Sequence, residues 1–219
     1  MLCGLFLQGQ SPERRDSLEW LVLDLQFEEF MNVRQEYPGS ISCYAESEMY
    51  FLRAFIDNTP EARSEYLKHF AQLTDSDRWS ELNVLDRSAL DLEKAVIQSR
   101  NGESISAAWN AYRALRGFQS EAKMQSESPR ARAYWGLSLS LISFLPEEEQ
   151  RYARWIGLYG DPSMGLEMMG DALDKMVQTM AETARLRFLY YMMLLQAGKK
   201  DLIDRNALGE HFPDQFVKL

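Results

Sequence analysis

Four prolines directly follow a Ser, Thr or Asp, and each of these pairs precedes a stretch with helical spacing of apolar residues. The side chain of the first residue accepts a hydrogen bond from a free backbone N–H of the first helical turn, and proline loses no hydrogen bond there. Each pair therefore predicts a helix start. The pairs are Ser11-Pro12, Thr59-Pro60, Ser128-Pro129 and Asp161-Pro162.

Further helix starts follow turn residues elsewhere in the chain. These weaker starts lie near residues 41, 80, 104, 147 and 181. Apolar residues recur at helical spacing in the segments that follow, and no run of Val, Ile and Thr between turns favours a strand. The sequence therefore predicts an all-α protein of about nine helices.

The spacing of these starts is typical of helical repeats. From each start to the next but one the distance is 33 to 49 residues, and the last two distances, 33 and 34, are close to the tetratricopeptide period. Antiparallel helix pairs of this length stack on neighbouring pairs. We therefore predict one domain over residues 1–219, a right-handed helix-pair solenoid with a concave groove, in which residues 199–219 cap the last pair.

The stretch "GLSLSLISFLPEEEQRYARWIGLYGDP", Gly136 to Pro162, begins with an alternation of Leu and Ser that resembles a strand. A longer window favours a helix, because apolar residues from Tyr134 to Leu145 share one helical face. Pro146 should end this helix, since the residue before a proline is disfavoured in helical conformation. We expect a helix buried on most sides, a return helix and a turn, which together form one junction between repeats.

The segment from Gly136 to Leu173 is similar to tetratricopeptide-like proteins of the inclusion-body-clearance and outer-membrane-protein type. Those proteins combine a Ser-rich helix ending in Leu-Pro, a helix ending in a Gly-Asp turn, and "GL" followed by "L..A". The likeness extends loosely over residues 104–196 and is not found in the first hundred residues. It implies a helical-repeat adaptor without known catalysis and carries over no ligand. The matching positions are Leu145, Pro146, Ile156, Gly157, Gly160, Asp161, Gly165, Leu166, Ala172 and Leu173.

Charge and hydropathy exclude some classes of partner. The chain has 33 acidic against 24 basic residues, a formal net charge of −9, which disfavours a nucleic-acid partner. The longest stretch without charge, Ala133 to Pro146, has 14 residues, whereas a membrane-spanning helix needs roughly 20 apolar residues. We predict no transmembrane segment and no nucleic-acid partner.

The apolar segment 1–10 leaves the cellular compartment open. It is either an ordinary first segment that packs on the domain or the end of a signal sequence whose basic front is missing. The protein is accordingly cytoplasmic or exported, of the periplasmic type. Cys3 and Cys43 lack the spacing of a disulfide framework or a zinc site, so we expect two free thiols.

No motif in the chain supports catalysis or cofactor binding. It lacks the glycine-rich phosphate loops, the HExxH metal motif and the GxSxG nucleophile motif. Its two histidines are His69 and His211, and we interpret Glu65 and His69, at i and i+4, as a surface helix pair. We predict no cofactor, no metal site and no enzymatic activity.

Arginines recur on three predicted helices and suggest a binding surface. If these helices line the concave side, their guanidinium groups form a cationic ladder for an acidic peptide or a C-terminal carboxylate, with aromatic residues as apolar anchors. If they pair with neighbouring acids, they are ordinary surface residues. The candidate residues are Trp109, Tyr112, Arg113, Arg116, Arg151, Arg154, Arg187 and Tyr190, with Arg185 beside Arg187 in the ladder.

We therefore expect a non-catalytic scaffold that binds a peptide or partner protein in its groove. One alternative is an assembly subunit that pairs through its terminal helices. Another is an enzyme or a small-ligand carrier that uses the Met- and aromatic-rich C-terminal half, because seven of the 11 methionines lie between residues 164 and 193. Flexible thioethers suit a promiscuous site, but they also fill gaps between stacked helices.

Overall fold

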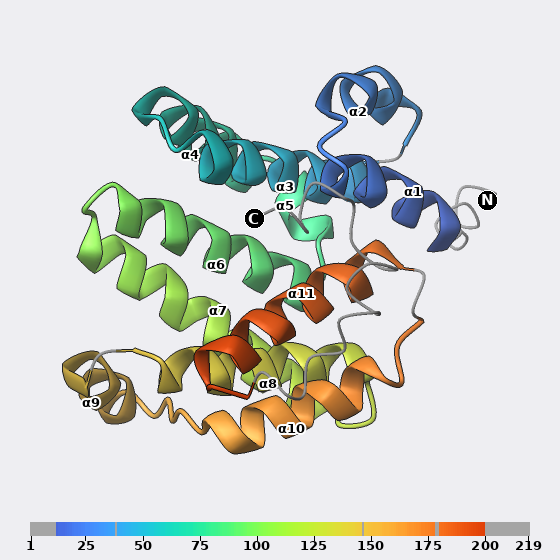
Figure 1. Ribbon diagram of the computed structural model, residues 1–219. Helices are drawn as coiled ribbons and strands as arrows, with labels where there is room; N and C mark the ends of the chain where they lie inside the picture. The colour runs from blue at the N-terminus through green and yellow to red at the C-terminus, as the bar shows by residue number, and fades with distance from the viewer. Residues whose placement is uncertain (1–11, 38, 146, 178–179, 200–219) are drawn as a thin grey trace, which may run out of the picture.

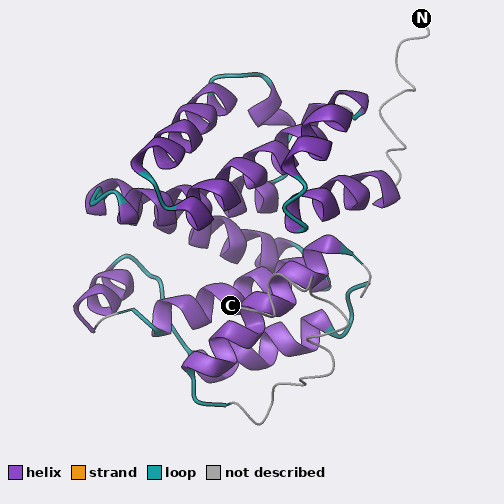
Figure 2. Ribbon diagram, turned by 45° about the horizontal axis from the view of Figure 1, so that its top comes forward, coloured by secondary structure: helices purple, strands orange, loops and turns teal. Residues whose placement is uncertain are grey.

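The computed structural model describes residues 12–37, 39–145, 147–177 and 180–199. All regular elements in these ranges are helices, as Figure 2 shows, which confirms the predicted all-α class. Residues 1–10 and nearly all of the predicted cap at 199–219 lie outside the described residues. The elements are α1 (Pro12–Leu23), α2 (Phe27–Val33), the short 3-10 helix η1 (Arg34–Glu36), α3 (Gly39–Asp57), α4 (Pro60–Thr74), α5 (Arg78–Glu81), α6 (Val84–Arg100), α7 (Ser104–Met124), α8 (Pro129–Ser143), α9 (Glu147–Trp155), α10 (Pro162–Leu173) and α11 (Ala181–Gln196).

The predicted cap chemistry is present at three of the four sites. The hydroxyl oxygen of Thr59 accepts a hydrogen bond from the Ala62 N–H at 3.2 Å, ahead of α4. Ser128 and Asp161 accept in the same way ahead of α8 and α10. The fourth cap, Ser11, lies outside the described residues. Helices begin where predicted at Pro12, Pro60, Ser104, Pro129, Glu147, Pro162 and Ala181.

Two of the predicted helices are divided in the structure. The first is interrupted at Leu25, whose backbone φ of 59° is incompatible with a right-handed helix, and α2 follows as a separate helix. The helix expected from residue 80 is interrupted at Leu82, and Asn83 then caps α6 by accepting from the Asp86 N–H at 2.9 Å. Both interruptions lie inside stretches of apolar periodicity, so spacing alone does not reveal them.

The stretch with alternating Leu and Ser forms α8 and not a strand. Leu137, Ser138, Leu139 and Ser140 are all buried, although they point to successive sides of the helix. The Ser138 hydroxyl donates to the Tyr134 carbonyl oxygen at 2.9 Å, which satisfies this buried polar group within the helix. The predicted helix buried on most sides is therefore confirmed.

Glycines allow α8 to lie close against α10. A Cβ atom added to Gly136 of α8 would lie 2.7 Å from the Gly165 carbonyl oxygen and 2.9 Å from the Met169 backbone nitrogen, both on α10. Neither distance leaves room for a side chain. A stack of successive helices would place α9 in this position, but the extensive contacts of α8 are with α10.

Helices pair at three places in the molecule. α3 lies beside α4, α6 beside α7, and α8 beside α10 (Figure 1). α3 also contacts α6, and α7 contacts α8, so the three pairs follow one another through the molecule. α9 lies at one end of α8 and contacts little else (Figure 1).

The last described helix, α11, returns across the molecule to the first. It contacts α1 as well as α8 and α10, and in Figure 1 it lies between the layer of α1 and α3 and the layer of α8 and α10. In a solenoid each repeat contacts only its neighbours. The contact between α1 and α11 departs from that pattern, so the predicted solenoid is not confirmed.

A cluster of buried apolar side chains connects the helix pairs. It extends from Tyr44 on α3 through Phe70 on α4 and Phe118 on α7 to Leu186 on α11. A smaller cluster around Phe30 joins α1, α2 and α3. Among the described helices, none combines the length and the apolar character that crossing a bilayer requires.

Candidate functional site

Two of the predicted arginines lie on α9 beside exposed aromatic residues. Arg151, Tyr152, Arg154 and Trp155 line one open hollow of about 570 Å³. Trp155 is 87% exposed and Tyr152 is 65% exposed. Within the described part of the chain, neither guanidinium group forms an ion pair or a hydrogen bond. We call these four residues the α9 surface.

Few contacts hold α9 to the rest of the molecule. The Gln150 amide donates to the carbonyl oxygens of Ser143 and Leu145, at 2.9 and 2.8 Å, where α8 ends. Ala153 is buried on the inner side of α9, and Leu158 is buried just after it. These residues hold one side of α9 against the rest of the molecule, so the side that carries Tyr152 and Trp155 is accessible to a partner.

Sequence reasoning found the arginines of the α9 surface but missed its aromatic residues. Tyr152 and Trp155 stand at i and i+3, and Tyr159 follows with 62% of its surface exposed. Aromatic residues at this spacing are typical of a buried helix face. Only the exposure of these side chains distinguishes a recognition surface from a core.

Four further predicted residues lie together on α7. Trp109 is 61% exposed, and its ring centroid is 5.7 Å from that of half-buried Tyr112. Arg113 forms an ion pair with buried Asp91 of α6, so its charge is partly neutralised. The Arg116 guanidinium donates to the side chain of Gln119 at 3.2 Å and stays exposed.

The last two predicted residues lie on α11. Tyr190 is half-buried, with its hydroxyl against Gly170 of α10, and burial raises the pKa of its phenol. Arg187 is half-buried as well. The main contacts between elements join α7 to α6 and α8, α9 to α8, and α11 to α1, α8 and α10. Among the described elements, α7, α9 and α11 do not pack extensively against one another. A cationic ladder along all three helices therefore stays a prediction.

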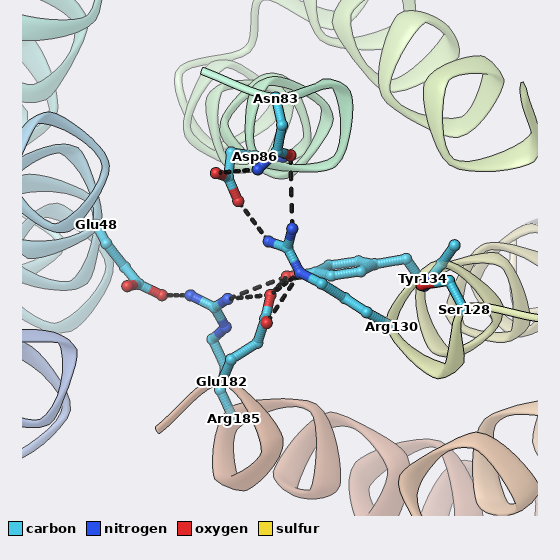
Figure 3. A network of polar contacts seen from close by, with 9 residues as sticks. Glu48, Asn83, Asp86, Ser128, Arg130, Tyr134, Glu182 and Arg185 are labelled. Carbon is cyan, nitrogen blue, oxygen red and sulfur yellow. Dashed lines mark hydrogen bonds and ion pairs between the residues drawn. The ribbon is translucent and has the colours of Figure 1, made fainter. Parts of the chain in front are cut away.

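A buried polar network occupies the space between the helix pairs (Figure 3). At its centre, Nε of Arg130 on α8 donates to both carboxylate oxygens of Glu182 on α11, at 2.8 and 2.9 Å. The same guanidinium group forms an ion pair with Asp86 near the start of α6. The Tyr134 hydroxyl donates to Glu182 at 3.1 Å. One arginine therefore links three helices.

A second arginine extends this network to α3. Arg185 on α11 forms an ion pair with Glu48, whose side chain is only 2% exposed, and donates to the Tyr134 hydroxyl at 3.0 Å (Figure 3). The prediction that Arg185 belongs to an exposed ladder is wrong, because its charge is directed into the interior. Sequence reasoning missed the network, since its partners lie far apart in the chain.

The network holds the helices together, and its charged groups are directed at one another. Its carboxylates and guanidinium groups neutralise each other, as buried charges must. Burial raises the pKa of the Tyr134 phenol well above its ordinary value, so the hydroxyl stays protonated and serves as donor and acceptor. We therefore place the candidate site on the surface and not in this interior.

A Ser and a His also approach each other, on α3 and α4. The Ser47 hydroxyl oxygen is 3.0 Å from Nε2 of His69, and the His69 ring stacks on Tyr50 with centroids 4.4 Å apart. Burial and the charges of nearby arginines lower the pKa of His69 to about 4. Ser47 is fully buried and cannot reach a substrate, so the pair is structural. The Glu65 carboxylate instead lies beside Arg53, with 3.7 Å between Oε2 and Nη1, and His69 is half-buried against Ser47.

The buried thiol and the methionines mostly contribute to packing. Cys43 is buried, and burial raises its pKa to about 11, which suppresses the reactive thiolate. Met169 is fully buried between helices, whereas Met164 and Met192 are about half-exposed. Core filling therefore accounts for part of the Met-rich segment. Among the described residues, no group of three or more His, Cys, Asp and Glu side chains is arranged to hold a metal ion.

Comparison with known proteins adds no relative to these observations. No protein-family model, curated protein or solved structure matches this chain. The resemblance to tetratricopeptide-like proteins therefore stays a prediction from the sequence, and the function has to be argued from the surfaces themselves.

Proposed function

We propose that this chain is a non-catalytic protein-interaction module that binds an acidic segment of a partner protein on the α9 surface. One observation carries the proposal. Arg151 and Arg154 lie beside exposed Tyr152 and Trp155, and neither arginine is neutralised by another described residue. Surface arginines of a protein with a net charge of −9 have many acids available to them, so unpaired ones point to an external anion.

The chemistry of the α9 surface favours an acidic peptide. A guanidinium group binds a carboxylate through two parallel hydrogen bonds, and such bonds are roughly twice as strong as neutral ones. Tyr and Trp are the aromatic residues that contribute most to binding energy at protein interfaces. An open hollow accepts an extended chain more readily than it encloses a small molecule. These properties support a segment with paired acids beside an apolar residue.

We also propose that the helix pairs are repeats of a tetratricopeptide-like array. The pairs α3 with α4 and α6 with α7, each formed by helices that follow one another in the chain, support this origin. Such arrays commonly present an extended surface to partner proteins. The alternative of assembly through uncovered terminal helices has less support, because α1 and α11 contact each other.

Selection of peptides against the full chain tests the proposed partner. We expect a displayed random-peptide library to yield segments with adjacent Asp or Glu and a neighbouring apolar residue. A synthetic peptide of this kind should bind at least about tenfold more weakly to the double variant Arg151→Ala/Arg154→Ala, because each charge-assisted hydrogen bond contributes roughly 1.5–3 kcal/mol. Trp155→Ala should weaken the same peptide by a similar factor.

Arg53→Ala is the matched control, since Arg53 is also an exposed arginine but lies 3.7 Å from both Asp57 and Glu65. It should leave peptide binding unchanged. Selected peptides without enriched acids, or equal binding by the double variant and the native chain, would show that the α9 surface does not bind acidic segments.

A further inference from the structure

Three cations surround one carboxylate where α6 lies beside α7 (Figure 1). Arg87 stands four positions before Asp91 on α6 and Lys94 three positions after it, so both are neighbours of Asp91 on that helix. Arg113 of α7 forms an ion pair with Asp91. Burial raises the pKa of Asp91, and the charges of all three cations act against this rise. We call these four residues the α6–α7 cluster, in which three positive charges meet one negative charge.

Two of the three cations have no acid of their own. Within the ranges that the structure describes, neither Arg87 nor Lys94 forms an ion pair or a hydrogen bond. Both are half-buried, so water screens their charges only in part. Burial and then the charge of Arg113 lower the pKa of Lys94. Glu103, the other acid that acts on Lys94, already accepts hydrogen bonds from two side chains at the end of α6.

Aromatic residues adjoin the α6–α7 cluster on both sides. On α7, Trp109 stands four positions before Arg113 and Arg116 three positions after it, so both share the side of Arg113. Trp109 is 61% exposed, and Arg116 is exposed as well. On α4, the ring centroid of buried Phe70 lies 4.4 Å from Nζ of Lys94. The cations therefore lie between a buried ring and an accessible one.

We propose that the α6–α7 cluster binds the phosphate group of a phosphate monoester whose organic part lies against Trp109. A phosphate monoester carries close to two negative charges at neutral pH, and the cluster has two more positive than negative charges. A guanidinium group matches two phosphate oxygens at once, whereas lysine binds phosphate as a point charge. A carboxylate has only one charge and would leave one of the cations without a counter-ion.

This site is separate from the α9 surface and takes a different anion. Arg87, Lys94 and Arg113 belong to α6 and α7, and the main contacts of both helices are with elements other than α9. Two sources supply a phosphate monoester, namely a small phosphorylated molecule and a phosphorylated side chain of a partner protein. The recognition chemistry is the same for both, and the size of the ligand separates them by experiment.

Isothermal titration of the full chain with phenyl phosphate tests the site. Arg87→Gln and Lys94→Gln should each raise the dissociation constant at least about tenfold, because each removes a charge-assisted contact with the phosphate. Neither variant should lower the free energy of unfolding in urea without ligand, since neither residue has an ion pair to lose. Phenyl sulfate, which has one charge, should bind more weakly than phenyl phosphate. Trp109→Ala should weaken phenyl phosphate but not inorganic phosphate.

Two variants outside the cluster are the controls. Lys175→Gln changes an exposed lysine just after α10 and should leave the affinity for phenyl phosphate unchanged, as should Arg151→Ala/Arg154→Ala. Tighter binding of a short phosphotyrosine peptide than of phenyl phosphate supports a phosphorylated partner, and weaker binding supports a small molecule. Absence of binding, equal affinity in the native chain and both cluster variants, or loss of binding in Arg151→Ala/Arg154→Ala overturns the proposal.

Discussion

Arg185 on α11 forms an ion pair with Glu48 on α3, and the two side chains are 17% and 2% exposed. These residues are far apart in the chain, yet they meet in its interior. The pair continues through Tyr134 and Glu182 to Arg130, which joins α6 and α8 to the same network (Figure 3). Ion pairs as well as apolar packing therefore join α11 to α3, α6 and α8.

Arg185→Met should destabilise the protein strongly. The substitution leaves the Glu48 carboxylate buried without its cation, which typically costs about 3–5 kcal/mol. Urea denaturation of the variant and the native chain measures the difference. Glu48→Met/Arg185→Met should lose less than Arg185→Met alone, because both charges are then absent. If the losses of the two single variants simply add, the pair is not coupled.

Gly136→Ala should destabilise the contact between α8 and α10. Its Cβ would lie 2.7 Å from the Gly165 carbonyl oxygen, so the backbones must separate, at a cost of about 1–3 kcal/mol. Gly170→Ala on α10 is the control, because its nearest neighbour is the Tyr190 hydroxyl at 3.0 Å, the end of a side chain that can move. The midpoint of thermal unfolding should fall for the first variant and stay nearly unchanged for the second.

Glu93 should make the protein less stable as the pH rises. Burial raises the pKa of its carboxyl to about 8, from an ordinary value of 4.5, and its Oε2 atom has no hydrogen-bond partner among the described residues. Between these pH values the folded chain holds a proton that the unfolded chain releases, so the free energy of unfolding falls with pH. Urea denaturation between pH 6.5 and 8 should show this slope. Glu93→Gln should flatten it, and an equal slope in the variant would contradict the assignment.

His69 should have the opposite effect at lower pH. Its pKa is lowered from 6.5 to about 4, first by burial and then by the charges of Arg78 and Arg34. Between pH 4 and 6.5 the unfolded chain binds a proton that the folded chain does not, so the free energy of unfolding falls as the pH falls. Because Glu93 acts in the other direction there, the comparison belongs in a Glu93→Gln background. Adding His69→Gln should remove the remaining acid-side loss.

The candidate site could be predicted from the sequence only in part. The positions of Arg151 and Arg154 on one helix follow from local spacing, but the exposure of Trp155 beside them does not. Arg185 is the opposite case. Its spacing in the sequence resembles that of a surface arginine, but in the structure its charge is buried against Glu48. Burial depends on neighbours that are remote in the chain, so a local pattern cannot separate an exposed arginine from an interior one.

The all-α class and most helix starts could be predicted locally, because capping and hydrophobic periodicity depend on residues only a few positions apart. Thr59, Ser128 and Asp161 form the hydrogen bonds that their positions predict. The packing of α8 against α10 and the return of α11 to α1 could not be predicted in this way. Those pairings depend on the close approach of helix backbones at glycines such as Gly136. They also depend on which acidic side chain forms an ion pair with each buried arginine. Such choices are settled by packing over the whole chain.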